Sequence, residues 1–150
     1  MKNLEKVEDM PLWKEANDIA EYMYGLLPDF PAEEEWHTRV KLHNNSVDFI
    51  FWAGLALGNV NPTGREFDWG NFYKYTVSLK TMYRFAGRQR FIKLDPAMMV
   101  RLDKLQEQIT AQIEQSYAQN EDYRRTESEK DLKPWQERYE IWKKLGEEPR

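Results

Sequence analysis

Histidine and carboxylate pairs are the first residues to test for chemistry, because helical proteins use them to hold metal ions. A di-iron site in a four-helix bundle takes a glutamate from each of two helices and a Glu-x-x-His pair from each of the other two. Only Glu34 with His37 has this spacing, since Val40 stands three residues before His43. We therefore expect no di-iron site, and we interpret His43 as a hydrogen-bonded core residue rather than a haem ligand.

Nucleophilic chemistry has no better support in the sequence. None of the four serines lies in a Gly-x-Ser-x-Gly context, and no glycine-rich phosphate loop is present. The absence of cysteine excludes thiol catalysis and thiolate metal sites. Glu33, Glu34 and Glu35 are adjacent, so on a helix they point in different directions and cannot form a facing acid–base pair. The sequence predicts no catalytic site, no metal and no cofactor.

Positive charge is concentrated in one part of the chain. Met1–Glu35 holds three basic and ten acidic residues, whereas Asp68–Leu94 holds six basic and one acidic. We call five of these cations the basic strip: Lys80, Arg84, Arg88, Arg90 and Lys93. Two interpretations are open. The strip is neutralised by the acidic first segment, or by the start of the second, of the same or a neighbouring subunit, or it contacts the phosphates of RNA or DNA without base specificity.

Small and aromatic residues mark a second candidate surface. Gly54 and Gly58 stand one turn apart, and each costs a helix interior about 1 kcal/mol relative to alanine, which suggests that another backbone approaches closely. Phe49, Phe51 and Trp52 cover three sides of the same helix, more than one small bundle can readily bury. A contiguous exposed apolar patch usually marks an interface, so we expect these five residues to lie between copies of a homo-oligomer.

Four segments with a helical hydrophobic period must position these residues. They run from Pro11 to Leu27, from Pro31 to Asn59, from Asp68 to Gly87 and from Pro96 to Tyr117. In the second segment the period is kept by Trp36, Val40, His43, Val47, Ile50 and Gly54. Val60–Phe67 contains Asn-Pro and Gly and is predicted to be a loop, and Asp68 and Asp95 are the expected N-caps of the helices that follow. The fold class indicated is all-α, an antiparallel up-down-up-down four-helix bundle.

The end of the chain differs from the rest. Ala118–Lys133 is polar with both charge signs, and we interpret it as a flexible linker. A short amphipathic helix then follows, with Trp135, Tyr139, Trp142 and Leu145 on one face. The expected division is a bundle over residues 1–123 and a linker with a helical appendage over 124–150. We expect the appendage to dock on its own bundle or on a neighbouring copy, with capture of a partner groove as the alternative.

Length and hydropathy limit the class of protein further. The chain has 150 residues, the usual size of one domain, and its formal net charge of −4 argues against wholesale nucleic-acid binding without excluding a local basic surface. The longest apolar run, Phe49–Leu57, is far shorter than the roughly 20 residues that a spanning helix needs. The charged start Met1–Asp9 does not resemble a signal peptide. We expect a cytoplasmic protein with no membrane span.

Two motifs carry a resemblance to a known family. The stretches Met10–Ala16 (MPLWKEA) and Leu27–Glu34 (LPDFPAEE), the second leading into a helix that ends in small residues, resemble the bacterial four-helix-bundle proteins first noticed as reading frames in intervening sequences of ribosomal RNA genes. The accessory variability determinant of diversity-generating retroelements is similar in the same respects. The resemblance covers about Met10–Tyr117. The family's Ser-Asn-Ile-Ala-Glu-Gly motif is replaced here by Asn45–Ile50 (NSVDFI), and this chain is acidic where the retroelement proteins are strongly basic.

The resemblance implies an antiparallel bundle that assembles as a ring, typically a pentamer, without enzymatic activity. Our first hypothesis is therefore a non-catalytic accessory or scaffold protein that forms a ring-like homo-oligomer. The alternative hypothesis is a nucleic-acid-binding accessory factor of a reverse transcriptase, as in diversity-generating retroelements. In that case the basic strip on the third helix is the expected contact surface.

Overall fold

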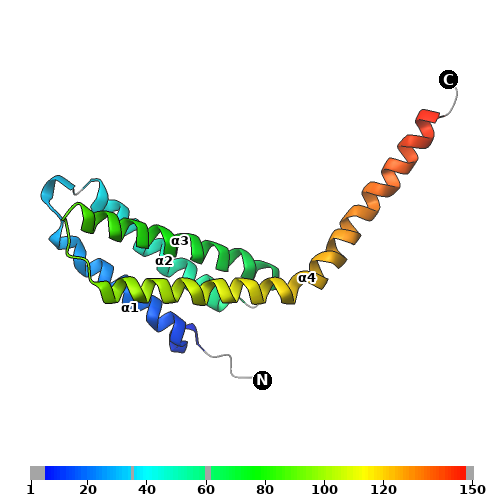
Figure 1. Ribbon diagram of the computed structural model, residues 1–150. Helices are drawn as coiled ribbons and strands as arrows, with labels where there is room; N and C mark the ends of the chain where they lie inside the picture. Colours follow the sequence, from blue (N-terminus) through cyan, green and yellow to red (C-terminus); the bar gives the residue numbers. More distant parts are fainter. Residues whose placement is uncertain (1–5, 35, 60–61, 148–150) are drawn as a thin grey trace. The chain divides into compact units, whose positions relative to one another are not determined.

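The described chain consists of helices and their connections. The computed structural model describes residues 6–34, 36–59 and 62–147; within these, it leaves undescribed the side chains of 62, 63, 122–124, 126–128, 131, 132, 135, 146 and 147. The elements are the short 3-10 helices η1 (Val7–Asp9), η2 (Leu27–Asp29) and η3 (Ala32–Glu34) and the α-helices α1 (Pro11–Leu26), α2 (Thr38–Gly58), α3 (Pro62–Arg88) and α4 (Pro96–Glu147) (Figure 1). Contacts divide the chain into two units, Met1–Ser116 and Tyr117–Arg150, which are considered separately below.

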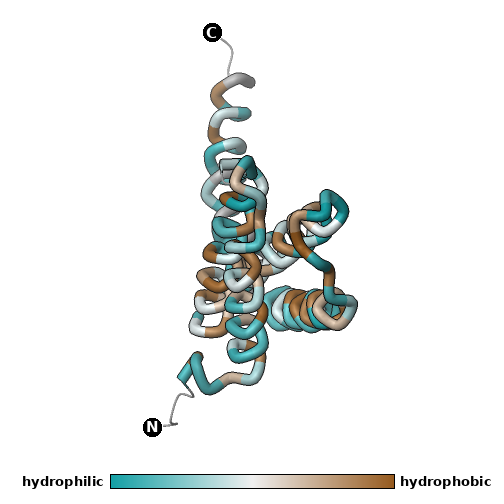
Figure 2. The backbone as a smooth tube through the Cα atoms, turned by 90° about the vertical axis from the view of Figure 1, so that its left-hand side faces the viewer, coloured by the Kyte–Doolittle hydropathy of each residue, from teal (hydrophilic) through white to brown (hydrophobic). Residues whose placement is uncertain are grey.

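The first unit is built around one apolar core. Each of α1, α2, α3 and the N-terminal part of α4 contributes buried residues at steps of three and four, which places them on one face of each helix. The largest fully buried apolar side chains are Ile19, Met23, Leu42, Phe49, Phe72, Leu79, Tyr83, Leu102, Leu105 and Ile109. In Figure 2 apolar positions recur between hydrophilic ones along these helices, as this arrangement requires.

The predicted starts of two helices are confirmed, together with the signals that mark them. Helix α1 begins at Pro11 and ends at Leu26, and η2 follows directly from Leu27. The Leu27 carbonyl oxygen accepts the backbone N–H of Phe30 at 3.3 Å and also Arg39 Nε at 3.1 Å, so the Arg39 side chain joins α2 to the end of α1. Asp95 caps α4 as expected, because its Oδ1 accepts the backbone N–H of Ala97 at 2.9 Å.

Helix α2 turns a different face inward from the one that the sequence pattern indicates. The buried residues are Thr38, Leu42, Ser46, Phe49, Ala53 and Ala56, one position away from the predicted stripe. Trp36 and Val47 of that stripe are exposed. The helix also starts at Thr38 rather than at Pro31. Of the acidic residues expected in its first turn, Glu33 and Glu34 belong to η3, and Glu35 lies outside the described residues. The reason is that Phe49–Leu57 is apolar on every side, so the pattern fits two neighbouring stripes equally well.

Helix α3 begins six residues earlier than predicted. Residues 62–67, assigned from the sequence to a loop, are helical, while Val60 and Asn61 lie outside the described residues. Asp68 is consequently not a cap but a buried residue within the helix, where its Oδ2 accepts a hydrogen bond of 2.7 Å from Asn59 Nδ2. Arg65 Nε also donates to the Asn59 carbonyl oxygen at 3.2 Å. Two side chains of the new helix thus hold the end of α2, which is why the connection is short.

The predicted flexible linker is also helical. Ala118–Lys133 forms part of α4, which continues through Pro134 to Glu147 without a break. Polar composition removes a hydrophobic core but not helix propensity, and Glu, Gln, Lys and Arg are good helix formers. The contacts change at Ser116 and Tyr117, seven residues before the predicted boundary at 123. The C-terminal segment is therefore a continuation of α4 rather than a separate short helix after a loop.

Gly87 supplies the space in which the chain turns from α3 to α4. A Cβ atom built on Gly87 would overlap the side chain of Leu94, so a larger residue fits at this position only if Leu94 or the backbone moves. Gly70 in the same helix has no neighbour within 4 Å of the equivalent point.

We expect Gly87→Ala to lower the free energy of unfolding by about 1–3 kcal/mol, because overpacking forces the backbone or Leu94 to move. The matched change Gly70→Ala should raise it by about 0.5–1 kcal/mol through helix propensity alone. Urea unfolding followed by circular dichroism measures both. Equal effects of the two substitutions would show that the turn tolerates a methyl group.

Candidate functional site

Four aromatic rings gather on the outer surface of α2 and α3. We call Phe51, Trp52, Phe67 and Tyr75 the aromatic patch. Trp52 lies at its centre, stacked on Tyr75 with ring centroids 6.4 Å apart and an interplanar angle of 7°, and it meets Phe51 and Phe67 edge-on at 5.3 and 5.8 Å. Phe51 and Phe67 remain 56% and 66% exposed. The patch is an ordered apolar surface that faces solvent within a single copy.

Three of the five predicted interface residues have other surroundings. Phe49 is fully buried against Phe72, with ring centroids 5.4 Å apart, so it belongs to the core of its own chain. The neighbours of the two glycines are side chains of the same chain rather than the backbone that was expected. A Cβ on Gly54 would lie 3.4 Å from the Trp13 ring of α1, and a Cβ on Gly58 would lie 3.4 Å from Val7. Phe51 is exposed, whereas Trp52 is half-buried and packs against the core. Phe67 and Tyr75 are neighbours that the sequence pattern did not reveal.

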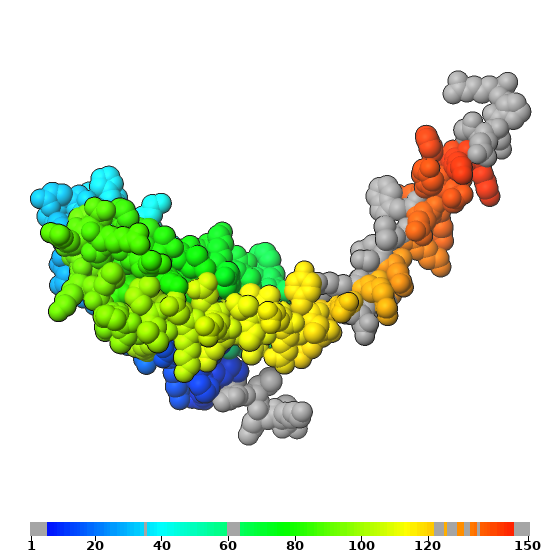
Figure 3. Space-filling model, viewed as in Figure 1, coloured from blue at the N-terminus to red at the C-terminus, as the bar shows by residue number. Residues whose placement is uncertain are grey.

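The basic strip is paired at one end and open at the other. Lys80 forms an ion pair with Asp103 of α4. Figure 3 shows the face on which α3 (green) and the start of α4 (yellow-green) lie side by side. Among the described residues, no carboxylate lies within ion-pair distance of the four remaining cations, which are exposed: Arg84, Arg88, Arg90 and Lys93.

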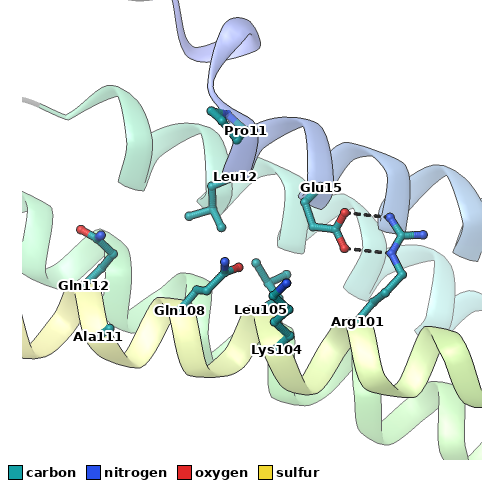
Figure 4. Close-up of a pocket in the computed structure, with 9 residues that line it drawn as sticks. All are labelled: Pro11, Leu12, Glu15, Arg101, Lys104, Leu105, Gln108, Ala111 and Gln112. Atoms are coloured by element: carbon teal, nitrogen blue, oxygen red, sulfur yellow. Dashed lines mark hydrogen bonds and ion pairs between the residues drawn. The ribbon is translucent and has the colours of Figure 1, made fainter.

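The acidic residues of α1 are therefore not the partners of this strip within the chain. Glu15 binds Arg101 of α4 instead, with both carboxylate oxygens at 2.8 Å from guanidinium nitrogens (Figure 4). This hydrogen bond holds the pKa of Glu15 below its ordinary value and raises the pKa of Arg101. Leu12 points from α1 toward Leu105 in the groove beside the pair. The pair joins α1 to α4, and because the two charges neutralise each other, neither is available to bind a ligand.

A hydroxyl chain in the first unit joins three parts of the fold. The fully buried Tyr83 accepts the backbone N–H of Asp95 at 2.7 Å, and its hydroxyl lies 3.0 Å from that of Tyr22. Burial, with the hydrogen bond to Tyr83, raises the pKa of Tyr22 well above its ordinary value. The Tyr22 hydroxyl thus stays neutral at physiological pH and has a positioning role. The sequence pattern did not single out either tyrosine.

The histidines lie away from any metal-binding arrangement. His43 is exposed on α2 rather than in the core, and its Nε2 lies 3.1 Å from the Tyr24 hydroxyl and its Nδ1 3.2 Å from Asn44 Oδ1. Across the described part of the chain, no three side chains of histidine, aspartate or glutamate converge in a way that could hold a metal ion. In the same residues, no helix combines the length and the apolar character needed to cross a bilayer.

The predicted docking residues of the C-terminal segment lie on the second unit. Tyr139, Trp142 and Leu145 are exposed, as is Ile141, and the rings of Tyr139 and Trp142 are 6.1 Å apart. The side chain of Trp135 is outside the described set. What this face docks on stays a prediction.

Comparison with known proteins leaves the assignment to the geometry. No family model, no curated protein and no solved structure matches the chain.

The Glu15–Arg101 pair makes stability depend on pH. Because the folded pKa of Glu15 is lowered, the pair stabilises the fold above the ordinary carboxyl pKa, and this contribution is lost as the pH falls through the lowered value. Both side chains are about a third exposed, so solvent screening limits the contribution to about 1 kcal/mol. Glu15→Gln should lower the free energy of unfolding at pH 7 by that amount and reduce its fall between pH 5 and 3, whereas the exposed Glu107→Gln should change neither. Urea titrations across this range provide the measurement.

Proposed function

We propose that this protein is a non-catalytic helical scaffold or accessory protein that assembles into a ring-like homo-oligomer through the aromatic patch. The observation that carries the proposal is the exposure of Phe51 and Phe67 around an ordered Trp52. Burying one such ring stabilises a complex by about 1.5–3 kcal/mol, and rings already held by their neighbours lose little conformational freedom on binding. Val47 and Leu55, also exposed on α2, extend the apolar surface one turn in each direction.

The proposed architecture of the first unit is an antiparallel up-down-up-down four-helix bundle. Two contacts support it for α2 and α3: Trp52 near the end of α2 meets Phe67 near the start of α3, while the first turns of α2 share a groove with the last turns of α3. The resemblance to the bacterial four-helix-bundle proteins suggests a pentamer. A cytoplasmic location fits a chain without cysteine.

Mass measurement in solution tests the assembly. The wild-type protein should sediment as a closed oligomer at micromolar concentration, and Phe51→Glu should shift it to monomer, because a carboxylate on the patch would be desolvated without a partner. Because Phe51 is exposed in a single copy, its substitution should not change the far-ultraviolet circular dichroism. The control is Val100→Glu at an exposed position of α4, which should leave the mass unchanged. A wild-type monomer under these conditions would reject the proposal.

A second candidate function is supported by the open part of the basic strip. Arg84, Arg88, Arg90 and Lys93 are exposed cations without an acidic partner among the described residues, and such groups can neutralise phosphates. On this proposal the protein binds RNA or DNA as an accessory factor of a reverse transcriptase.

Titration with labelled single-stranded RNA distinguishes this candidate. The logarithm of the affinity should fall with the logarithm of salt concentration by about 0.7 for each phosphate contacted. Arg84→Glu combined with Arg88→Glu should abolish binding without unfolding the protein, whereas Lys14→Glu, which makes an equally exposed cation on α1 acidic, should reduce it only slightly. A slope near zero would refute phosphate binding.

A further inference from the structure

A groove runs between the first turns of α2 and the last turns of α3, away from the aromatic patch. We call it the α2–α3 groove. Trp36 and Phe85 stand at its edges with 81% and 44% of their surfaces exposed, and the half-buried Val40 and Met82 lie between them. Met82 packs against the core from below. The groove therefore has an apolar floor and large apolar edges, and the methionine can adapt to different side chains.

Positive charge lies beside this apolar floor. Lys41 is the charged side chain among the described residues that line the groove. Thr81 and Phe85 line both this groove and a second hollow, which Arg84 and Arg88 also line. The Glu34 carboxylate accepts a hydrogen bond of 3.1 Å from the hydroxyl of Thr38, which lines the groove. Lys41, Arg84 and Arg88 form no ion pair among the described residues.

From this arrangement we propose that the α2–α3 groove binds an acidic amphipathic helix of a partner protein. A helix that docks in a groove inserts apolar side chains spaced three and four residues apart, and its flanking residues meet the rims. Apolar anchors match Val40, Met82, Trp36 and Phe85, and carboxylates match Lys41 and Arg84. The proposal goes beyond self-assembly, because it uses none of the residues of the aromatic patch.

Two other occupants fit the groove less well. Cations flank the apolar face of the chain's own C-terminal helix, since Arg138 stands one turn before Trp142 and Lys143 one turn after Tyr139. In a second copy these cations would meet the cations beside the groove and be repelled. A nucleic acid would place sugars and phosphates over Val40 and Met82, which donate no hydrogen bond. The positive charge beside the groove and its apolar floor together favour an acidic amphipathic helix.

Peptide binding to the full-length protein tests this proposal. The probe is a labelled helical peptide of about 20 residues with Leu and Trp at i, i+4, i+7 and i+11 and Glu on both flanks, compared with the same peptide carrying Lys in place of Glu. We expect micromolar binding of the acidic peptide by fluorescence anisotropy and binding of the basic peptide at least about tenfold weaker. Phe85→Ala and Lys41→Glu should each weaken binding of the acidic peptide by about tenfold.

The controls separate this groove from the other surfaces. Phe51→Ala in the aromatic patch and Lys14→Glu on α1 should leave the affinity for the acidic peptide unchanged, and unaltered melting curves should show that all four variants are folded. Equal binding of the two peptides, or insensitivity to Phe85→Ala and Lys41→Glu, would overturn the proposal. It would also be overturned if Phe85→Ala dissociated the homo-oligomer, or if single-stranded RNA displaced the peptide while failing to bind the Phe85→Ala variant.

Discussion

The basic strip and the α2–α3 groove both depend on one contact at the end of α3, in which the Tyr83 hydroxyl accepts the backbone N–H of Asp95. Tyr83 is fully buried, so the N–H group that it accepts would otherwise lose a partner as the chain turns from α3 into α4. The same hydroxyl lies against Tyr22 of α1. One side chain thus sets the end of α3, the start of α4 and their position against α1. Arg84 and Phe85, which follow Tyr83 directly, face solvent because Tyr83 faces inward.

Helix α2 shows why the binding surfaces and the core cannot be separated by composition alone. Its middle is apolar on every side, and packing buries Phe49, Ala53 and Ala56 while leaving Phe51 and Leu55 exposed. The small residues allow α1 to approach, and the Trp13 ring lies over Gly54. The side chains that α2 leaves exposed are therefore as apolar as those that it buries. The exposed side of α2 is therefore the surface that the proposed self-assembly would bury.

The sequence was sufficient where a local signal and the packing agree. The proline at the start of α1 and the Asp95 cap of α4 mark real helix ends. The inward stripe that spacing predicts for α4 is buried at Leu102, Leu105 and Ile109, partly buried at Ile113 and exposed at Tyr117. The face of α2 was not predictable, because two stripes have the same period. The early start of α3 was not predictable either, because Asn59 is bonded to Asp68 and Arg65 through contacts that no spacing reveals. Of the candidate residues, Phe51 and Trp52 were found from bulk alone, whereas Phe67 and Tyr75 required knowing that α3 lies beside α2.

The aromatic patch and the α2–α3 groove occupy opposite halves of the same two helices. The patch uses the later turns of α2 and the earlier turns of α3, and the groove uses the reverse. An assembly formed through the patch would leave one groove open on every copy. A partner that carries several acidic helices would then bind with an avidity set by the number of copies, since each further helix binds at a high effective concentration. Weak individual grooves would be sufficient for a stable complex.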